Sequence, residues 1–357
     1  MDSTAPSGPR RNGGPQGALS TRRTRRPNGR RPEACAALDL GTNNCRLLVA
    51  HPARNGFRIV DAFSRVVRLG EGVEEAGRLS EPAIERTIEA LKVCAGKIRK
   101  RRVTRGRYVA TAACRKAENC DAFLDRVASE TGLRIEIISA EEEARLTLTG
   151  CLPLLDGAAP RALVFDIGGG STEVLWLDAA GPATRLIDWI SLPLGVVTLT
   201  ERYGQGPFPP DAYRTIVDEL LTLLQPFCER HEITRYVRDA AVQMLGSSGT
   251  VTTLAGLWQE LPRYDRSRVD GAFLEFEAVH RLTARLSAMS AEDRARHPCI
   301  GRDRADMMAA GCAILEAICR RWPVGRLRVA DRGIREGILV DLLGRGGNQA
   351  LLGDDRG

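Results

Sequence analysis

The chain contains one short pattern twice. The first copy covers residues 38–43 (LDLGTN) and the second covers residues 165–171 (FDIGGGS). Each copy is an apolar run, an aspartate, a turn with glycine and small polar residues, and then a second apolar run, which predicts a strand–turn–strand unit. One copy would mark any hairpin turn, but two copies predict two similar domains that face each other across a cleft.

Both turns predict a phosphate site. The N–H groups of such a turn can surround phosphate oxygens, and the aspartates at its base, Asp39 and Asp166, can bind a divalent cation. A third loop of small residues, 246–250 (GSSGT), lies between a predicted strand and a predicted helix, where it fits an anion site or an ordinary turn equally well. The predicted phosphate-binding residues are Gly41, Thr42, Asn43, Asn44, Gly168, Gly169, Gly170, Ser171, Ser248, Gly249 and Thr250.

The residues that would supply positive charge to this cleft are harder to identify than its phosphate-binding turns. The sequence lacks the motif G-x-x-x-x-G-K-[S/T], which excludes the P-loop NTPase mechanism. Arg46 is the basic residue that lies just beyond the first turn, so the remaining charge must come from a metal ion and from arginines elsewhere in the chain. Arg115 follows a predicted strand over 108–112, so its side chain either enters the cleft or is solvated near the start of a helix.

Three consecutive glutamates, Glu141, Glu142 and Glu143, open a predicted helix. Acidic residues in a first helical turn complement the helix dipole, which explains most such runs. A cleft that hydrolyses phosphoanhydride bonds also needs a base that deprotonates water, and a glutamate at this position beside Arg115 is placed for that role. The residue pattern alone does not choose among the three glutamates.

Composition limits the class of protein. A chain of 357 residues can form two domains with separate cores. No apolar stretch approaches the roughly 18 residues of a membrane span, and the N-terminus lacks the apolar segment of a secretory signal. The ten cysteines include no C-x-x-C pair, so we expect reduced, buried thiols in a cytoplasmic protein that has no zinc site.

The net charge of +7 comes from the first 32 residues. They hold eight arginines and one acidic residue, whereas residues 33–357 hold 44 basic and 44 acidic residues. Their Pro, Gly, Ser and Arg content predicts a disordered tail, which is either a solubilising extension or an arm that binds a polyanion. The same Pro and Gly content argues against a mitochondrial transit peptide.

The repeat divides the chain into a domain over 33–157 and a domain over 158–343, with tails over 1–32 and 344–357. The first domain is predicted in the order βββαβα, which is typical of ribonuclease-H-like domains, and the second repeats its opening. The final helix, which begins near Gly333, is a candidate to pack on the first domain. Strands are predicted over 36–40, 46–50, 57–67, 108–112, 133–138, 162–166, 174–177, 184–190, 242–246 and 326–330, and helices from Ser80 and over 117–131, 141–149, 210–230, 249–258, 275–288 and 303–321.

Seven motifs follow one another along the chain. They are DLGTNN (39–44), ATAACRKAEN (110–119), IISAEEEARL (137–146), DIGGGSTE (166–173), SLPLG (191–195), GSSGT (246–250) and DRGIREG (331–337). In this order they resemble the Ppx/GppA phosphatase family, the exopolyphosphatases and guanosine-pentaphosphate phosphohydrolases, over about residues 34–343. The chain resembles the short two-domain form of that family, which lacks the C-terminal helical region of longer members.

The resemblance implies an α/β fold of two ribonuclease-H-like domains of the actin-like ATPase superfamily, with a phosphate-binding cleft between them. It also implies a magnesium-dependent enzyme that releases orthophosphate from inorganic polyphosphate or from guanosine pentaphosphate. The glutamate directly before Ala-Arg-Leu, Glu143, would be the catalytic one, and Arg115 would clamp the phosphate. Magnesium is expected on Asp39, Asp166 and Glu143.

Two departures from the family pattern stand in the motifs. The first loop usually reads Ser-Asn-Ser but is Thr42-Asn43-Asn44 here, and the usual glycine before the glutamates is Ala140. Neither change removes a charged group, so we expect activity to survive both.

Two other functions remain open for the same cleft. One is a kinase of the same superfamily, and the other is a non-catalytic polyphosphate or nucleotide sensor. The kinase needs an adenine pocket and an acceptor-binding region, and the sequence identifies neither. The joint presence of Asp39, Arg115, Glu143 and Asp166 speaks against the sensor, because a protein that only binds phosphate would not need a base. We also expect a homodimer that does not contact a membrane.

Overall fold

The computed structural model describes residues 33–54, 56–181, 183–204 and 207–344. These residues belong to one compact unit. The predicted arginine-rich tail over 1–32 lies outside the described residues, as does the predicted C-terminal tail apart from Gly344. The proposed domain boundary near residue 157 stays a prediction.

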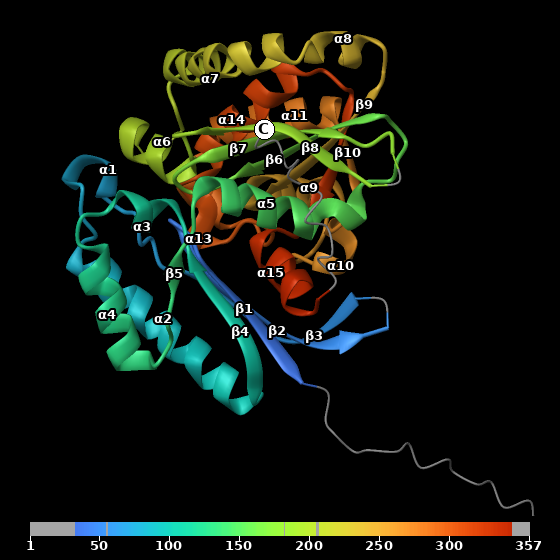
Figure 1. Cartoon of the computed structure of the whole chain (residues 1–357). Coiled ribbons are helices and arrows are strands. Elements are labelled where there is room, and N and C mark those ends of the chain that lie inside the picture. The colour runs from blue at the N-terminus through green and yellow to red at the C-terminus, as the bar shows by residue number, and fades with distance from the viewer. Residues whose placement is uncertain (1–32, 55, 182, 205–206, 345–357) are drawn as a thin grey trace, which may run out of the picture. The chain divides into compact units, whose positions relative to one another are not determined.

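The first half of the described chain forms a mixed five-stranded sheet, here called the first sheet (Figure 1). Its order is β3-β2-β1-β4-β5, with β1–β2 and β2–β3 antiparallel and β1–β4 and β4–β5 parallel. Its strands are β1 (Ala34–Leu40), β2 (Asn44–Ala53), β3 (Gly56–Val66), β4 (Val103–Ala110) and β5 (Glu136–Ile137).

The second sheet has six strands in the order β10-β11-β9-β6-β7-β8. Its β6–β7 pair repeats the β1–β2 pair, since each begins with a strand whose last residue but one is the motif aspartate. The strands are β6 (Arg161–Ile167), β7 (Thr172–Asp178), β8 (Arg185–Leu192), β9 (Val242–Ser248), β10 (Phe273–Glu275) and β11 (Arg326–Ala330).

Helix α2 (Glu81–Lys100) shows how the sequence specifies one helix on the first sheet. The Ser80 hydroxyl accepts a hydrogen bond from the N–H of Ala83 and so caps the start of the helix, where the sequence predicts that it begins. The apolar face that carries Ile84, Ile88 and Leu91 is buried. Helix α4 (Cys120–Thr131) covers the same face of the sheet, and its Phe123 and Val127 belong to the same apolar cluster (Figure 1).

Two helices lie between the sheets. Helix α5 (Ala140–Cys151) contributes Ala144 and Leu148 to a cluster with the second sheet. The last helix, α15 (Ile334–Leu342), contributes Ile338 and Leu339 to a cluster with β1, β2 and β4 of the first sheet (Figure 1). The last helix of the described chain therefore packs against its first two strands.

The other helices border the turns or cover the far face of the second sheet. They are α1 (Val73–Ala76), α3 (Ala112–Lys116), the 3₁₀ helix η1 (Leu152–Leu154), α6 (Val196–Tyr203), α7 (Pro210–Arg230), α8 (Ile233–Arg238), α9 (Gly249–Trp258), α10 (Arg266–Val269), α11 (Phe276–Ala288), α12 (Ala291–Ala295), α13 (Arg302–Ala305) and α14 (Met308–Arg321). Among the described residues, no helix combines the length and the apolar character that crossing a bilayer requires.

Several predicted elements differ from the structure. The helix predicted over 303–321 is divided into α13 and α14, and Asp306 at the division forms a salt bridge with Arg68 (2.7 Å). The strand predicted over 108–112 is β4, which begins earlier, at Val103. The prediction missed the first half of this strand, because that half is exposed and polar and shows no apolar run. The strand predicted over 133–138 is reduced to the two residues of β5, and α6 was not predicted.

Helices α5 and α15 cross at two glycines. A Cβ atom on Gly337 would lie 2.1 Å from the carbonyl oxygen of Leu146, and one on Gly150 would lie 2.2 Å from the carbonyl oxygen of Gly333. Both neighbours are backbone atoms, so neither can rotate away. The close crossing therefore requires glycine on both helices.

We predict that Gly337→Ala destabilises the protein by about 1–3 kcal/mol, because the added methyl group forces the two helices apart. Gly96→Ala, on α2, is the matched control: its Cβ would meet no atom within 4 Å. This control should gain about 0.5–1 kcal/mol from the better helix propensity of alanine. Urea unfolding measures both, and equal effects of the two changes would contradict the close crossing.

Candidate active site

A cavity of about 500 Å³ opens where the two copies of the repeat meet. Both glycine turns, the third small-residue loop and residues of α5 and α15 line it. All eleven predicted phosphate-binding residues are among its lining residues, together with Asp39, Asp166 and Glu143. The structure thus brings together three loops that lie more than 70 residues apart in the sequence.

The two glycine turns touch each other directly. A Cβ atom on Gly169 would lie 2.9 Å from Cβ of Thr42, and one on Gly170 would lie 2.9 Å from its hydroxyl oxygen. The space left by these two missing side chains is therefore filled by Thr42. The glycines allow the loops to approach each other as well as leaving backbone N–H groups open to a phosphate.

The three glutamates of α5 have different environments. Glu141 is exposed, and Glu142 forms salt bridges with Arg107 (2.8 Å) and Arg145 (2.7 Å). Glu143 is buried and is the member of the three that lines the cavity. The structure therefore separates Glu143 from its neighbours by burial, and it is the glutamate to which the family resemblance points.

Arg115 lies behind Glu143 and does not line the cavity wall. It belongs to α3, directly after β4, and donates from Nη1 to Oε2 of Glu143 (2.8 Å) and to the carbonyl oxygen of Ile138 (3.0 Å). Its side chain is 23% exposed, so it is neither free in solvent nor fully enclosed. In this conformation the guanidinium positions the glutamate.

Carboxyl groups are concentrated around the cavity. Burial and the nearby carboxylate of Glu173 raise the pKa of Glu143 to about 8, although Arg115 opposes the shift. Burial and the carboxylate of Glu143 raise the pKa of Asp166 to about 7. Burial likewise raises the pKa of Asp39, and one carboxylate oxygen of Asp39 is buried without a hydrogen-bond partner.

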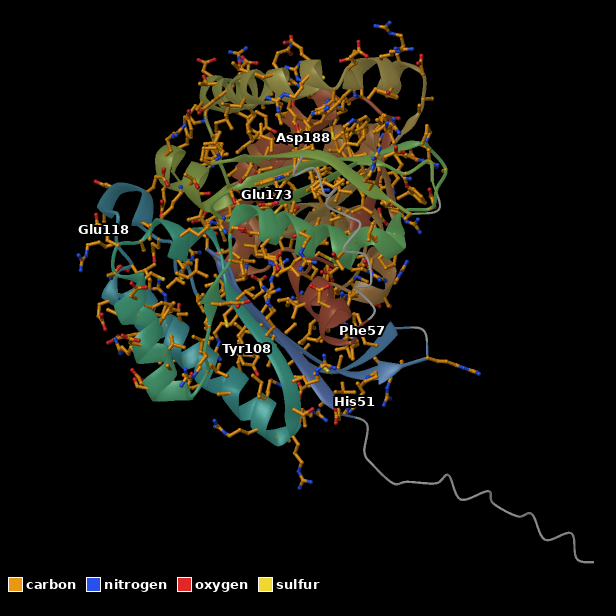
Figure 2. All side chains as sticks on the ribbon, in the orientation of Figure 1. His51, Phe57, Tyr108, Glu118, Glu173 and Asp188 are labelled. Carbon is orange, nitrogen blue, oxygen red and sulfur yellow. The ribbon has the colours of Figure 1, made fainter. Side chains whose placement is uncertain are left out.

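Glu173 is a part of this cluster that the sequence analysis did not identify. It pairs with Asp166 across β6 and β7, and its carboxylate accepts a hydrogen bond from the hydroxyl of Ser191 (2.8 Å). Figure 2 shows it on β7, close to the level of α5. Burial raises its pKa to about 7. The signal was its place at the end of the second motif, where the strand alternation puts it beside Asp166.

Arginines supply the opposite charge. Arg46 faces Asp39 across β1 and β2, Arg335 comes from α15, and Arg304 comes from α13. All three line the cavity, and none has a carboxylate within 4.0 Å in the described part of the chain. Burial lowers the pKa of Arg304 and of Arg335, which means that their charges lack full compensation by the protein.

Two further arginines in the cavity wall are held by ion pairs. Arg266 donates to Glu336 (2.7 Å), and Arg332 donates to Asp270 (2.7 Å). The first pair connects α10 to α15, and the second connects the end of β11 to the residue that follows α10, so both fix the wall. The sequence analysis assigned no role to Arg266, Arg304, Arg332 or Arg335, although the last motif contains two of them. These positions converge only when β11 and α15 return to the first sheet.

The donor set suits a hard divalent cation. Asp39 and Asp166 present carboxylate oxygens, the preferred ligands of magnesium, and the unpartnered oxygen of Asp39 would gain a ligand. Within the described ranges, no group of three or more His, Cys, Asp or Glu side chains is arranged to hold a metal ion. A magnesium ion here would therefore need water or phosphate oxygens to complete its shell.

The cysteines take no part in this site. All ten are buried and free, as predicted for a reduced protein.

The sequence and the fold of this chain are similar to those of known proteins. The family model described as "Ppx/GppA phosphatase family" matches residues 48–346. The chain belongs to the Ppx/GppA phosphatase family. A curated relative, "Exopolyphosphatase 2" of Mycobacterium tuberculosis, is 33% identical over an alignment of 329 positions that covers 87% of this chain and 98% of the relative.

Solved structures of this family share the fold. A Ppx/GppA family member from Aquifex aeolicus has a TM-score of 0.71 at 30% identity, and the match covers 88% of this chain and 99% of that one. An exopolyphosphatase from Cytophaga hutchinsonii has a TM-score of 0.78 at 22% identity, covering 87% and 98%. The Ppx/GppA fold of two ribonuclease-H-like halves, each with a mixed sheet and helices, is confirmed for this chain.

We predict that the ligand-free protein loses stability as the pH rises from about 5 to about 8. Carboxyl groups whose pKa is raised on folding bind more protons in the folded state than in the unfolded state over this range, so the free energy of unfolding falls with pH. Glu143→Gln removes one of these groups and should flatten the decline.

The measurement is the urea midpoint at several pH values between these limits. Glu141→Gln is the control, because that exposed carboxylate lies outside the cluster. Its pH profile should parallel that of the parent protein. The slope is the diagnostic quantity, since Glu143→Gln also removes the Arg115 salt bridge and changes the absolute stability. A parent-like slope in Glu143→Gln would show that the buried carboxyl does not take up a proton.

Proposed function

We propose that this protein hydrolyses the terminal phosphoanhydride bond of inorganic polyphosphate and releases orthophosphate, with Glu143 as the base. The observation that carries the proposal is the position of Glu143, a buried carboxylate in the wall of a cavity formed by two glycine turns and several uncompensated arginines. Membership of the Ppx/GppA phosphatase family and the similarity to an exopolyphosphatase support the same reaction.

In this reaction, the oxygen of a water molecule attacks the terminal phosphorus while the bond from that phosphorus to the bridging oxygen breaks. Glu143 in its carboxylate form accepts the proton of the water, and Arg115 keeps that carboxylate oriented through its 2.8 Å hydrogen bond. In the ligand-free protein burial raises the pKa of Glu143 to about 8, and a cation bound nearby would favour the carboxylate form. The shortened chain leaves as a phosphate anion, which needs no proton. The N–H groups of the glycine turns and the cavity arginines stabilise the charge on the transferring phosphoryl group.

Magnesium is part of the proposal. Asp39 and Asp166 would hold it, with Glu143 as the third proposed ligand. Bound there, Mg²⁺ would neutralise the carboxylates and polarise phosphate oxygens. If this is right, phosphate release should require added magnesium.

The substrate preference between inorganic polyphosphate and guanosine pentaphosphate is a separate part of the proposal. Purified protein should be incubated with magnesium and each substrate in parallel. Free orthophosphate identifies a hydrolase and ranks the two substrates, transfer to ADP identifies a kinase, and tight binding without either identifies a sensor. The homodimer also stays a prediction, and analytical ultracentrifugation would measure the oligomeric state.

We predict that Glu143→Gln lowers the rate of phosphate release about 10²–10⁴-fold, because the amide cannot accept the proton of the attacking water. Glu141→Gln, two positions earlier on the same helix turn, is the matched control and should keep the parent rate, since its side chain is exposed to solvent. A parent-like rate in Glu143→Gln would remove this residue from the mechanism.

The arginine-rich segment over 1–32 is proposed as a polyanion arm. If it is one, its deletion should weaken the binding of long polyphosphate and reduce the salt dependence of that binding. The reason is that the truncated protein contacts fewer phosphates and so releases fewer counterions from the polyphosphate when it binds. Turnover of a short substrate should stay unchanged. Equal salt slopes for the full-length and truncated proteins would leave the segment as a simple extension.

A further inference from the structure

A second concentration of positive charge lies outside the cavity. Residues 97–107 contain seven basic residues and no acidic residue. They form the last turn of α2, the turn that follows it and the first half of β4. We call this segment, together with Arg58 of β3, the basic end of the first sheet.

The basic end lies at the opposite end of the sheet from the cavity. Ala34 pairs with Val103 at this end, whereas Leu40 pairs with Ala110 at the cavity end, next to Asp39. The six steps along β1 from Ala34 to Leu40 span roughly 20 Å at about 3.3 Å per residue. In Figure 2, His51 and Phe57 mark this end of the sheet, and Glu173 lies well away from it.

Part of the charge in the basic end is already compensated. Lys97 and Arg101 both contact the carboxylate of Asp61, at 2.7 and 2.8 Å, and these hydrogen bonds lower the pKa of Asp61 to about 2. Arg107 forms salt bridges with Glu136 and Glu142. These three basic residues belong to the internal ion pairs of the sheet.

The remaining basic residues have no such partner. They are exposed, and within the described residues none has a carboxylate within 4.0 Å. They are Arg58, Arg99, Lys100, Arg102 and Arg105. Five uncompensated cations at one end of a sheet create a positive potential that attracts an anionic partner with several charges.

Arg102 also has a backbone conformation that allows a sharp test. Arg102 follows the C-cap of α2 and has a φ of 52°, the left-handed conformation that glycine usually occupies at this position. A residue with a Cβ atom there costs on the order of 1 kcal/mol relative to glycine. The chain retains an arginine where a glycine would suit the backbone better.

An exposed edge connects the basic end to the cavity. Strand β3 is the edge strand of the first sheet, and Ser64 near its end lines the cavity. Beside it, the Arg65 guanidinium lies over the ring of Phe63, 5.2 Å from its centre. Arg58 lies at the other end of the same strand. A flexible polyanion that leaves the cavity along this edge meets basic side chains at both ends.

We propose that the basic end of the first sheet binds the distal part of a polyphosphate chain whose terminal phosphate occupies the cavity. This inference rests on the proposed function. It makes the enzyme selective for long chains, since a substrate of a few phosphates cannot span the roughly 20 Å between the two sites.

The chemistry of the surface favours an inorganic chain over a nucleic acid. Proteins that bind single-stranded nucleic acids combine cations with exposed aromatic rings on which bases stack. The exposed aromatic side chains of the described residues, Trp258 and Phe273, belong to α9 and β10 on the second sheet. At the basic end, the aromatic ring of Phe57 is half-buried, so the exposed side chains there offer mainly charge, which matches a ligand without bases.

The test compares steady-state kinetics on tripolyphosphate and on long-chain polyphosphate. The variant R99A/K100A/R105A removes three uncompensated cations. The control R214A/R235A/R238A removes three exposed arginines from α7 and α8 of the second half. Arg102→Gly is a second test variant, which removes one cation while relieving the backbone, so it should fold at least as well as the parent.

At low salt, R99A/K100A/R105A should raise the KM for long chains about tenfold or more, with kcat and the tripolyphosphate KM unchanged. Arg102→Gly should change the long-chain KM in the same direction by a smaller factor, the control should match the parent, and the differences should shrink as salt is added. Equal effects on both substrates, or none on the long chain, would overturn the inference while leaving hydrolysis established.

A different outcome would identify a nucleic acid as the partner and also overturn the inference. In that case R99A/K100A/R105A would lose the binding of an oligonucleotide while its kinetics on long-chain polyphosphate stay parent-like. Absence of phosphate release from either substrate would instead refute the proposed function.

Discussion

The crossing of α5 and α15 is the contact on which the rest of the structure depends. Gly150 and Gly337 let the two helices approach until a methyl group would touch the opposite backbone. One helix packs on the second sheet and the other on the first, so this crossing joins the two halves. Each helix also delivers a charged residue to the cavity, Glu143 from α5 and Arg335 from α15. Packing and chemistry are therefore set by the same contact.

The cavity combines two kinds of charge that are both unfavourable without a ligand. The carboxyl groups of Glu143, Asp166 and Glu173 raise one another's pKa in addition to the effect of burial. Arginines such as Arg304 lack a carboxylate partner. A phosphate chain would compensate the arginines, and a cation bound with it would compensate the carboxyl groups. This explains why the folded protein keeps groups that lower its stability when the cavity holds no phosphate and no cation. The arginines that do have partners, such as Arg266, instead hold the wall in place.

The positive charge of the chain is distributed by function rather than evenly. Some basic residues close ion pairs within the sheet, as Lys97 and Arg101 do on Asp61. Others point into the cavity, and a third set lies uncompensated at the far end of the first sheet. The overall charge balance of residues 33–357 hides this arrangement, because a neutral sum is compatible with strongly charged local surfaces.

The sequence by itself determined the strand–turn–strand repeat, the three loops, the start of α2 at Ser80 and the family, because each depends on residues close together in the chain. The tertiary structure decided which of the three glutamates is buried, since only packing against the two sheets distinguishes Glu143 from its neighbours. It also decided that Arg304 and Arg335 join a cavity that begins at Asp39, more than 260 residues earlier in the chain. The physical reason is that burial and electrostatic coupling depend on distances in space, and local sequence patterns contain no information about which distant segments will meet.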